Sequence, residues 1–360
     1  MKSDSILFFI SLFFSLVGLL VKDVTSSSMI EVSLLRYIPI LILYIKKFKW
    51  SYAAVLPILF WFGMFALYRI SWCQYSIPGM LVIGMLPVYF YVYNRITFSH
   101  DEISFIILLF VLAYLAYVVI SDNHSINPNQ VGFTFLILSV DIFICIFVNY
   151  PNSVIKNFSI LFLLFTTFLL IINTESRNSL MVFLIVIVSF FFKGRVMKYK
   201  SLILFVILIL YVLYPWIYCI YAEYYRYGLV NDTKVMGQDV FSGRQYIWVY
   251  ILYRILDPAY FWFGGIDTEW WGKSNHNSAL DIITRYGVPS LILFFSIMYF
   301  YFIESFKLVT GKYKSLLLLI LVTMIWGMNE SGLFLGYSFF LLLPISILRS
   351  KRIIYHKRLL

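Results

Sequence analysis

The chain has 360 residues, of which 62% are hydrophobic and 12% are charged. A water-soluble globular protein is about half apolar and about a quarter charged, so this composition excludes a soluble protein and predicts a surface that faces lipid. Three cysteines are too few for a disulfide framework, and Cys145 is expected to be a buried thiol. The first apolar run, 6–21, lacks a small-residue cleavage site after it, so we expect a retained helix and not a signal peptide.

About twelve stretches are apolar and long enough to cross a membrane as helices, which takes about 20 residues each. The turn between the last two is very short, since it holds only residues 329–332. The sequence therefore predicts an all-α polytopic membrane protein in which residues 1–360 form a single integral membrane domain. The predicted spans are 5–21, 28–45, 52–69, 76–93, 103–120, 131–149, 155–173, 178–193, 201–221, 286–306, 314–329 and 332–348.

Basic residues are concentrated on alternate connections between the predicted spans. One side collects eighteen of the twenty-eight lysines and arginines with four acids, whereas the other has ten basic residues and twelve acids. The positive-inside rule assigns the first side to the cytoplasm, so both termini are predicted to be cytoplasmic. The net charge of +11 thus follows from topology, and we expect no nucleic-acid partner. The basic residues on the cytoplasmic side are Lys2, Lys46, Lys47, Lys49, Arg95, Lys156, Lys193, Arg195, Lys198, Lys200, Lys307, Lys312, Lys314, Arg349, Lys351, Arg352, Lys357 and Arg358.

The longest polar interval, 222–285, lies on the opposite side in this topology, in a periplasm or its equivalent, between the ninth and tenth spans. The connections 173–178 and 329–330 lie on the same side. Neither ATP nor nucleotide sugars are supplied there, so any chemistry needs a substrate that arrives already activated. The sequence has no GxxxxGK[ST] phosphate loop and no H-E-x-x-H or paired-cysteine zinc motif, so we expect neither a cofactor nor a metal.

The periplasmic loop contains local structure of its own. Residues 241–256 are predicted to form a helix with Ser242 as its N-cap, because apolar residues recur at spacings of three and four. The Asp-Pro pair at 257–258 is expected to end this helix, and the Gly-Gly pair at 264–265 to form a turn. The aromatic residues of the loop either lie at the membrane interface or form a wall on which sugars stack. They are Tyr260, Phe261, Trp262, Phe263, Trp270 and Trp271.

One of the four histidines, His276, lies in the polar stretch 274–290 that ends the loop. A neutral imidazole is the side chain best suited to take a proton from a hydroxyl near neutral pH. Asn277 and Ser278 follow it directly, and Asp281 lies five residues further on. The functional interpretation is a general base, and the alternative is a surface histidine in a hydrated loop.

Three arginines are expected on the same side of the membrane. Arg244 begins the predicted loop helix, where a guanidinium beside free N–H groups can bind a diphosphate; the alternative is a solvated arginine. Arg177 lies at the outer end of a span, and its alternatives are an interfacial position or a pair with Glu175. Arg285 follows Asp281 by four residues, which is typical of an ion pair on a helix.

Two charged residues, Arg36 and Asp141, lie within apolar runs and are expected to face the interior of the helix bundle. They form either a structural pair or part of a path for lipid phosphates. Glu330 is a carboxylate at the outer face. It is either a candidate site residue or a residue that shapes the turn between the last two spans.

The residues around His276 resemble a known signature. His276-Asn277, nine further positions, Gly287 and then Ser290 are similar to the histidine motif of the O-antigen polymerase (Wzy) and O-antigen ligase-like membrane proteins, in which a small residue or a tyrosine occupies the last position. Ser290 departs from the usual glycine, threonine or tyrosine there, although it is small.

Other parts of the chain resemble the same family. The segment 242–244 followed by Trp248 is similar to the arginine–aromatic start of the family's periplasmic loop, and 176–178 at the head of a helix is similar to its second outward arginine. The predicted spans, with their large periplasmic loop between helices 9 and 10, match the family's GT-C-like architecture over the whole chain.

The resemblance implies a metal-independent glycosyltransferase of the bacterial inner (cytoplasmic) membrane that acts on its periplasmic side. The donor is a glycan on undecaprenyl diphosphate, His276 is the base, and Arg244 and Arg177 hold the diphosphate as it leaves. The implied partners are the lipid-linked oligosaccharide, membrane lipids, a chain-length regulator (Wzz-like) and a flippase. The substrate-binding residues are then expected among Asn277, Arg285, Glu330, Trp248, Trp270, Trp271 and Arg36.

Several functions stay open at this point. The favoured one is an O-antigen polymerase of lipopolysaccharide biosynthesis, which joins the growing glycan to another lipid-linked repeat unit. An O-antigen ligase would use the lipid A–core sugar as the acceptor. A lipid-linked oligosaccharide flippase is a further alternative, but the chain shows no convincing internal repeat of the kind that transporters have. A non-catalytic assembly protein would not need the set of arginines and histidine.

Overall fold

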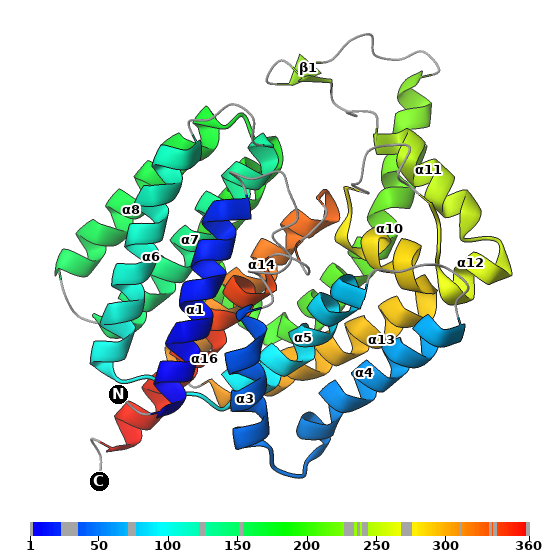
Figure 1. Ribbon diagram of the computed structural model, residues 1–360. Helices are drawn as coiled ribbons and strands as arrows, with labels where there is room; N and C mark the ends of the chain where they lie inside the picture. The colour runs from blue at the N-terminus through cyan, green and yellow to red at the C-terminus, as the bar shows by residue number, and fades with distance from the viewer. Residues whose placement is uncertain are drawn as a thin grey trace.

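The computed structural model describes residues 3–22, 35–70, 77–121, 127–150, 154–226, 234–235, 238–239, 244–267, 276–309, 311–330, 333 and 337–357. These residues are almost entirely helical (Figure 1). The short strands β1 (Lys234–Val235) and β2 (Gln238–Asp239) form one antiparallel pair. The helices of the membrane domain are α1 (Ser3–Lys22), α3 (Tyr37–Lys47), α4 (Tyr52–Ile70), α5 (Ile77–Tyr93), α6 (His100–Ser121), α7 (Pro128–Asn149), α8 (Val154–Asn173), α9 (Arg177–Val196), η1 (Met197–Tyr199), α10 (Lys200–Arg226), α13 (Ser278–Leu308), η3 (Gly311–Leu316), α14 (Leu317–Met324), η4 (Ile325–Met328) and α16 (Ser338–Lys357).

Six helices in the described part of the chain are long and apolar enough to cross a membrane: α1, α6, α7, α8, α10 and α13. They confirm the expectation of an all-α chain with several membrane helices. Shorter apolar helices occur in α4, α9, α14–η4 and α16. The beginning of α1 and the end of α16 lie at the same end of the molecule, as expected if both termini are on one side (Figure 1). The twelve-span topology and the GT-C-like arrangement stay predictions.

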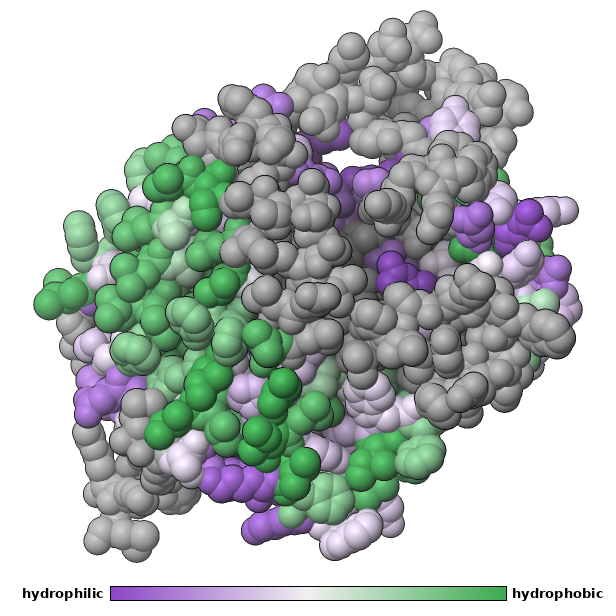
Figure 2. All heavy atoms as spheres, in the orientation of Figure 1, coloured by the Kyte–Doolittle hydropathy of each residue, from purple (hydrophilic) through white to green (hydrophobic). Residues whose placement is uncertain are grey.

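The helix α7 lies at the centre of one half of the molecule. It packs against α6, α8, α9 and α16, and nearly all of its residues are buried. The outer helices α6 and α8 instead expose large apolar side chains such as Leu112, Leu115, Phe158 and Phe162. Hydrophobic side chains cover the face that these two helices form (Figure 2). Such a surface is unfavourable in water, and it fits a bilayer in which lipid replaces water around the helices.

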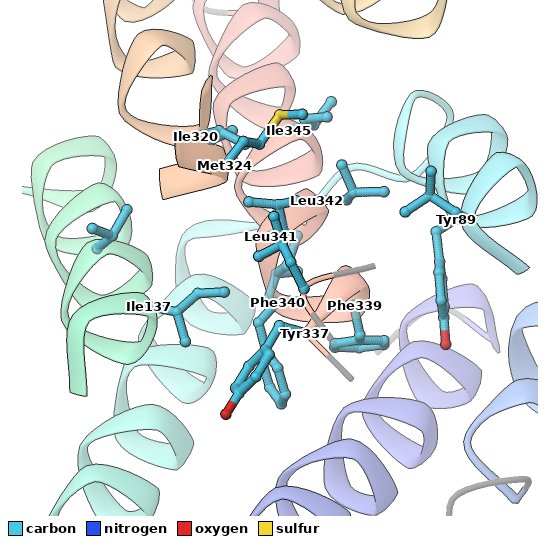
Figure 3. Packing of buried hydrophobic residues seen from close by; sticks show 14 of the residues in the cluster. Tyr89, Ile137, Ile320, Met324, Tyr337, Phe339, Phe340, Leu341, Leu342 and Ile345 are labelled. Carbon is cyan, nitrogen blue, oxygen red and sulfur yellow. The ribbon is translucent and has the colours of Figure 1, made fainter. Parts of the chain in front are cut away.

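The C-terminal helix α16 joins the two halves of the bundle. Figure 3 shows Phe339 of α16 beside Tyr89 of α5, and Phe340 and Leu341 on the side of α16 toward Ile137 of α7. The rings of Phe339 and Tyr89 meet edge to face with 5.6 Å between their centroids. Side chains from distant parts of the sequence thus form one continuous core.

The expected break at Gly287 is present. Two helical stretches of α13 (Ser278–Leu308) meet at a kink, where Gly287 has the non-helical angles φ 81° and ψ 170°. The stretch after the kink corresponds to the predicted span 286–306. A Cβ at Gly287 would lie 2.5 Å from the carbonyl oxygen of Trp262. Glycine is required here both by its backbone angles and by this close approach.

Trp262 belongs to α12 (Pro258–Phe263), a short helix that packs along α13. It follows α11 (Arg244–Arg254), which lies within the predicted helix 241–256. The Asp257-Pro258 pair ends α11 as expected, and Asp257 then caps α12 by accepting a hydrogen bond from Ala259 N. The expected turn is present, since Gly264 and Gly265 both have positive φ. It attaches the loop to α13 through hydrogen bonds from Gly265 N and Ile266 N to Thr284 O.

We predict that Gly287→Ala lowers the thermal unfolding midpoint of the detergent-solubilised protein. The backbone strain of a non-glycine residue in this region costs on the order of 1–3 kcal/mol, and the clash with the Trp262 carbonyl adds to it. Gly18→Ala is the matched control, because nothing lies within 4 Å of a Cβ at Gly18. Equal midpoints for the two variants would contradict the close contact between α12 and α13.

Candidate functional site

The side chain of Glu330 is the centre of a polar cluster at one end of the bundle. Its Oε1 atom accepts hydrogen bonds from Arg244 Nη2 at 2.6 Å and from Asn129 Nδ2 at 2.7 Å. Its Oε2 atom lies 3.4 Å from His276 Nδ1. The Glu330 side chain is 4% exposed, that of Arg244 14% and that of His276 28%. Arg244, Asn129 and His276 are far apart in the sequence. The structure brings all three to the carboxylate of Glu330.

Four helices contribute to this cluster from their N-terminal ends. Arg244 is the first residue of α11, Arg177 the first of α9 and Ser278 the first of α13, while Asn129 is the second of α7. The N-terminus of a helix carries a partial positive charge and N–H groups without helical partners. Four such ends and two arginines thus bring positive charge close to one point. Glu330 is the carboxylate placed among them.

The start of α13 fixes His276 relative to Glu330. Asn277 caps the helix, since its Oδ1 accepts hydrogen bonds from Ala279 N and Leu280 N. Its Nδ2 donates to Met328 O at 2.8 Å, and Ser278 Oγ donates to Glu330 O at 2.8 Å. These bonds attach residues 277 and 278 to the turn that holds Glu330. His276, directly before the cap, has a left-handed φ of 49°, which is uncommon for a residue other than glycine.

Asn129 is held by α9. Ser176 Oγ donates to Asn129 Oδ1 at 3.1 Å, so the amide of Asn129 directs its N–H group toward Glu330. Ser176 Oγ also lies 2.8 Å from Ser179 Oγ. A Cβ at Gly132 would come within 2.7 Å of Ser176 Cβ, so glycine allows α7 and α9 to approach this closely.

Arg177 lies near the same cluster. Its side chain is half-buried, and both Arg177 and Arg244 interact electrostatically with Tyr218 of α10. Arg244 also interacts with the neighbouring Tyr214. The two predicted catalytic arginines thus have Tyr218 as a common neighbour.

Several predicted binding residues have other surroundings. Trp248 is fully buried and packs edge-on against Tyr218 with 4.7 Å between ring centroids, so it supports the site through packing and does not present a face to a ligand. Asn277 is also fully buried and acts as a helix cap. Arg285 interacts with the adjacent Tyr286. Trp270 and Trp271 lie outside the described residues, as does the predicted N-cap Ser242.

Arg36 and Asp141 are buried as expected, but they form a separate feature. Arg36 Nη2 donates to the hydroxyl of Tyr37 at 2.7 Å, and its carbonyl accepts from Ser11. Asp141 Oδ2 has no hydrogen-bond partner in the described part of the chain. The proposed structural pair between them is not present there, and the contacts of Arg36 are with α1, α3 and α5 and not with the Glu330 cluster.

Sequence reasoning missed Asn129 and the two tyrosines Tyr214 and Tyr218, and it gave no contacts for Ser176 and Ser278. The signal for Asn129 is the Asn-Pro pair at 127–128, which is typical of a helix start: Asn127 caps α7 and Pro128 is its first residue. That signal places Asn129 at a helix end. It does not identify its partner, because Glu330 lies 201 residues further along the chain.

The cluster has no evident metal-binding set, since the described residues include no group of three or more histidine, cysteine or acidic side chains placed to hold a metal ion. Its chemistry is instead that of a histidine, a carboxylate and two guanidinium groups. No protein-family model, curated protein or solved structure matches the chain. The arrangement of these side chains is therefore the basis on which function is considered.

We predict that Asn277→Ala lowers the thermal unfolding midpoint, because it removes a helix cap worth about 1 kcal/mol and also a buried hydrogen bond to Met328. Asn157→Ala is the control, since Asn157 is exposed on α8. Asn277→Ser retains an oxygen that can cap the helix, and we expect it to lose less. If Asn277→Ala unfolded at the same temperature as the control, the cap would not hold the start of α13.

Proposed function

We propose that the chain is a glycosyltransferase that takes its donor glycan from a polyprenyl diphosphate at the outer face of a bacterial inner membrane. The observation that carries the proposal is the arrangement of Arg244, Glu330 and His276 at four helix N-termini. Helix N-termini and guanidinium groups bind phosphate groups well, and the histidine supplies a base beside them. The apolar surface of α6 and α8 fits a protein whose substrates also reside in the bilayer.

The proposed reaction needs no energy source besides its donor. The O–H bond of an acceptor sugar breaks, its proton passes to His276, and the oxygen attacks the anomeric carbon of the donor. The bond from that carbon to the diphosphate oxygen breaks, and its electron pair leaves with the diphosphate. Arg244, Arg177 and the helix N-termini stabilise the negative charge that develops there. The proton then passes from His276 to the leaving group or to water.

The ring nitrogens of His276 have different roles in this proposal. Nδ1 faces Glu330, so a tautomer with its proton on Nδ1 donates toward the carboxylate. Nε2 is then the nitrogen that accepts the proton from the acceptor hydroxyl. A carboxylate beside the first nitrogen orients the ring and stabilises the imidazolium that forms.

The favoured activity is that of an O-antigen polymerase, in which the acceptor is another lipid-linked repeat unit. Its partners are then undecaprenyl-diphosphate-linked oligosaccharide, membrane lipids, a chain-length regulator and a flippase. The ligase alternative uses the same chemistry with lipid A–core as the acceptor, so the cluster alone supports both. A flippase requires no base for a hydroxyl and makes less use of the His276–Glu330 contact.

We predict that cells in which this chain carries His276→Ala make surface glycan with a single repeat unit in place of long chains, because the acceptor hydroxyl is no longer deprotonated. Gel electrophoresis of the lipopolysaccharide measures this. His100→Ala is the matched control, since the His100 side chain is 56% exposed and lies outside the cluster, and it is expected to retain long chains. Long chains in the His276→Ala cells, with the protein present in the membrane, would refute the assignment of the base.

The same gel separates the candidate activities when the whole gene is deleted. Loss of a polymerase leaves one repeat unit on lipid A–core. Loss of a ligase leaves none there and causes lipid-linked polymer to accumulate. Loss of a flippase leaves none and produces no polymer at the outer face.

A further inference from the structure

A buried carboxylate in contact with both Arg244 and His276 needs a role of its own. We propose that Glu330 is a positioning residue that acts through His276: it holds the imidazole with Nε2 toward the acceptor and balances the positive charge that the ring gains. This inference rests on the proposed function and extends it. The alternatives are that Glu330 binds the substrate directly, or that it only shapes the turn between the last two helices.

The hydrogen bonds of Glu330 argue against direct contact with an acceptor. Its Oε1 already accepts from both Arg244 and Asn129, and its Oε2 faces His276. The side chain is nearly inaccessible, whereas more than a quarter of His276 is exposed. The carboxylate is thus placed behind the imidazole, and the imidazole is the group that a substrate can reach.

The hydrogen bonds of Glu330 also argue against a role confined to the turn. The turn is already held by its backbone, because Glu330 O accepts from Ser278 and Met328 O accepts from Asn277. Asn129 lies on a different helix, and Ser176 in turn orients it. Arg244 and Asn129 donate to Oε1 of Glu330. The other oxygen, Oε2, is then directed at His276. This is the arrangement that fixes a general base in one orientation.

The contact between Arg244 and Glu330 is compatible with diphosphate binding. Only Nη2 of Arg244 is engaged by the carboxylate, and a guanidinium has five N–H donors. Glu330 can therefore orient Arg244 while its other N–H groups bind a phosphate. One carboxylate would then set the distance between the base and the group that binds the leaving diphosphate.

The pH dependence of the reaction reports this role. Among the residues that the structure describes, the elements of this cluster carry these charged and titratable groups: Arg244 on α11, Arg177 on α9, Tyr214 and Tyr218 on α10, and Asp281 on α13. A carboxylate next to an imidazole favours the imidazolium, whereas an arginine disfavours it. Replacing Glu330 with a neutral residue removes the negative charge and leaves the positive charge of Arg244 uncompensated. Both effects favour the neutral ring, so the acid limb of the pH–rate profile moves to lower pH.

The experiment compares Glu330→Gln, Asn129→Ala, His276→Ala and the unchanged chain, each purified into lipid nanodiscs. The substrate is lipid-linked oligosaccharide extracted from source cells that lack this chain. We expect Glu330→Gln to lower kcat about 100-fold or more, with the acid limb of the pH–rate profile moved to lower pH and KM for the donor changed much less. Asn129→Ala keeps the negative charge of Glu330. We therefore expect a smaller loss of kcat and no shift of the acid limb of the pH–rate profile. Glu304→Gln is the matched control, because Glu304 pairs with Arg95 away from the cluster.

The outcomes distinguish this inference from the proposed function. Full activity in His276→Ala would overturn the assignment of the base and thus both proposals. An inactive His276→Ala with a Glu330→Gln rate within threefold of the unchanged chain would overturn only the role of Glu330. A loss in Glu330→Gln that equals the loss in Asn129→Ala, with the acid limb unmoved in both, would also overturn it, because that pattern belongs to a structural residue.

Discussion

The hydrogen bonds and ion pair of the Glu330 carboxylate are the interactions on which the rest of this site depends. Burying an isolated charge is costly, and removing one partner of a buried pair typically costs several kcal/mol. Here Arg244 and Asn129 compensate one carboxylate oxygen and His276 contacts the other. The carboxylate in turn allows an arginine and a histidine to lie close together among helix N-termini. Without it, the positive charge of Arg244 and the partial positive charges of the helix N-termini would repel one another.

Packing between helices holds the residues of the Glu330 cluster in fixed positions. The buried helix α7 carries Asn129 at its first turn, and glycine at 132 lets α9 approach close enough for Ser176 to orient that amide. On the other side, the glycine turn at 264–265 and the non-helical Gly287 fasten the loop helices to α13, which begins beside His276. The polar groups are therefore positioned by helices and not by free loops. The exposed apolar residues of α6 and α8 fit a surrounding bilayer.

Much of this could be predicted from the sequence, for physical reasons that particular residues make clear. Long apolar runs can only be helices in lipid, so α6, α7 and α8 appear where the runs at 103–120, 131–149 and 155–173 are. Glycine pairs and the Asp-Pro pair at 257–258 act locally, and their turns were also found as expected. His276, Arg244 and Glu330 were each identified as candidates by residue type and position. Their contacts depend on tertiary packing between segments far apart in sequence, so the pattern could not show that Glu330 links the other two, that Asn129 joins them, or that Trp248 is buried.

We propose above all that the cluster around Arg244 and Glu330 binds a diphosphate. The most direct measurement is the affinity of undecaprenyl diphosphate for the purified chain in nanodiscs, compared with Arg244→Ala, Arg244→Lys and Arg254→Ala. Arg254 lies at the opposite end of α11 and is exposed, so it is a matched arginine outside the cluster. We expect at least a tenfold loss of affinity in Arg244→Ala, equivalent to about 1.4 kcal/mol, with a smaller loss in Arg244→Lys and none in Arg254→Ala. Equal affinities for all four proteins would contradict it.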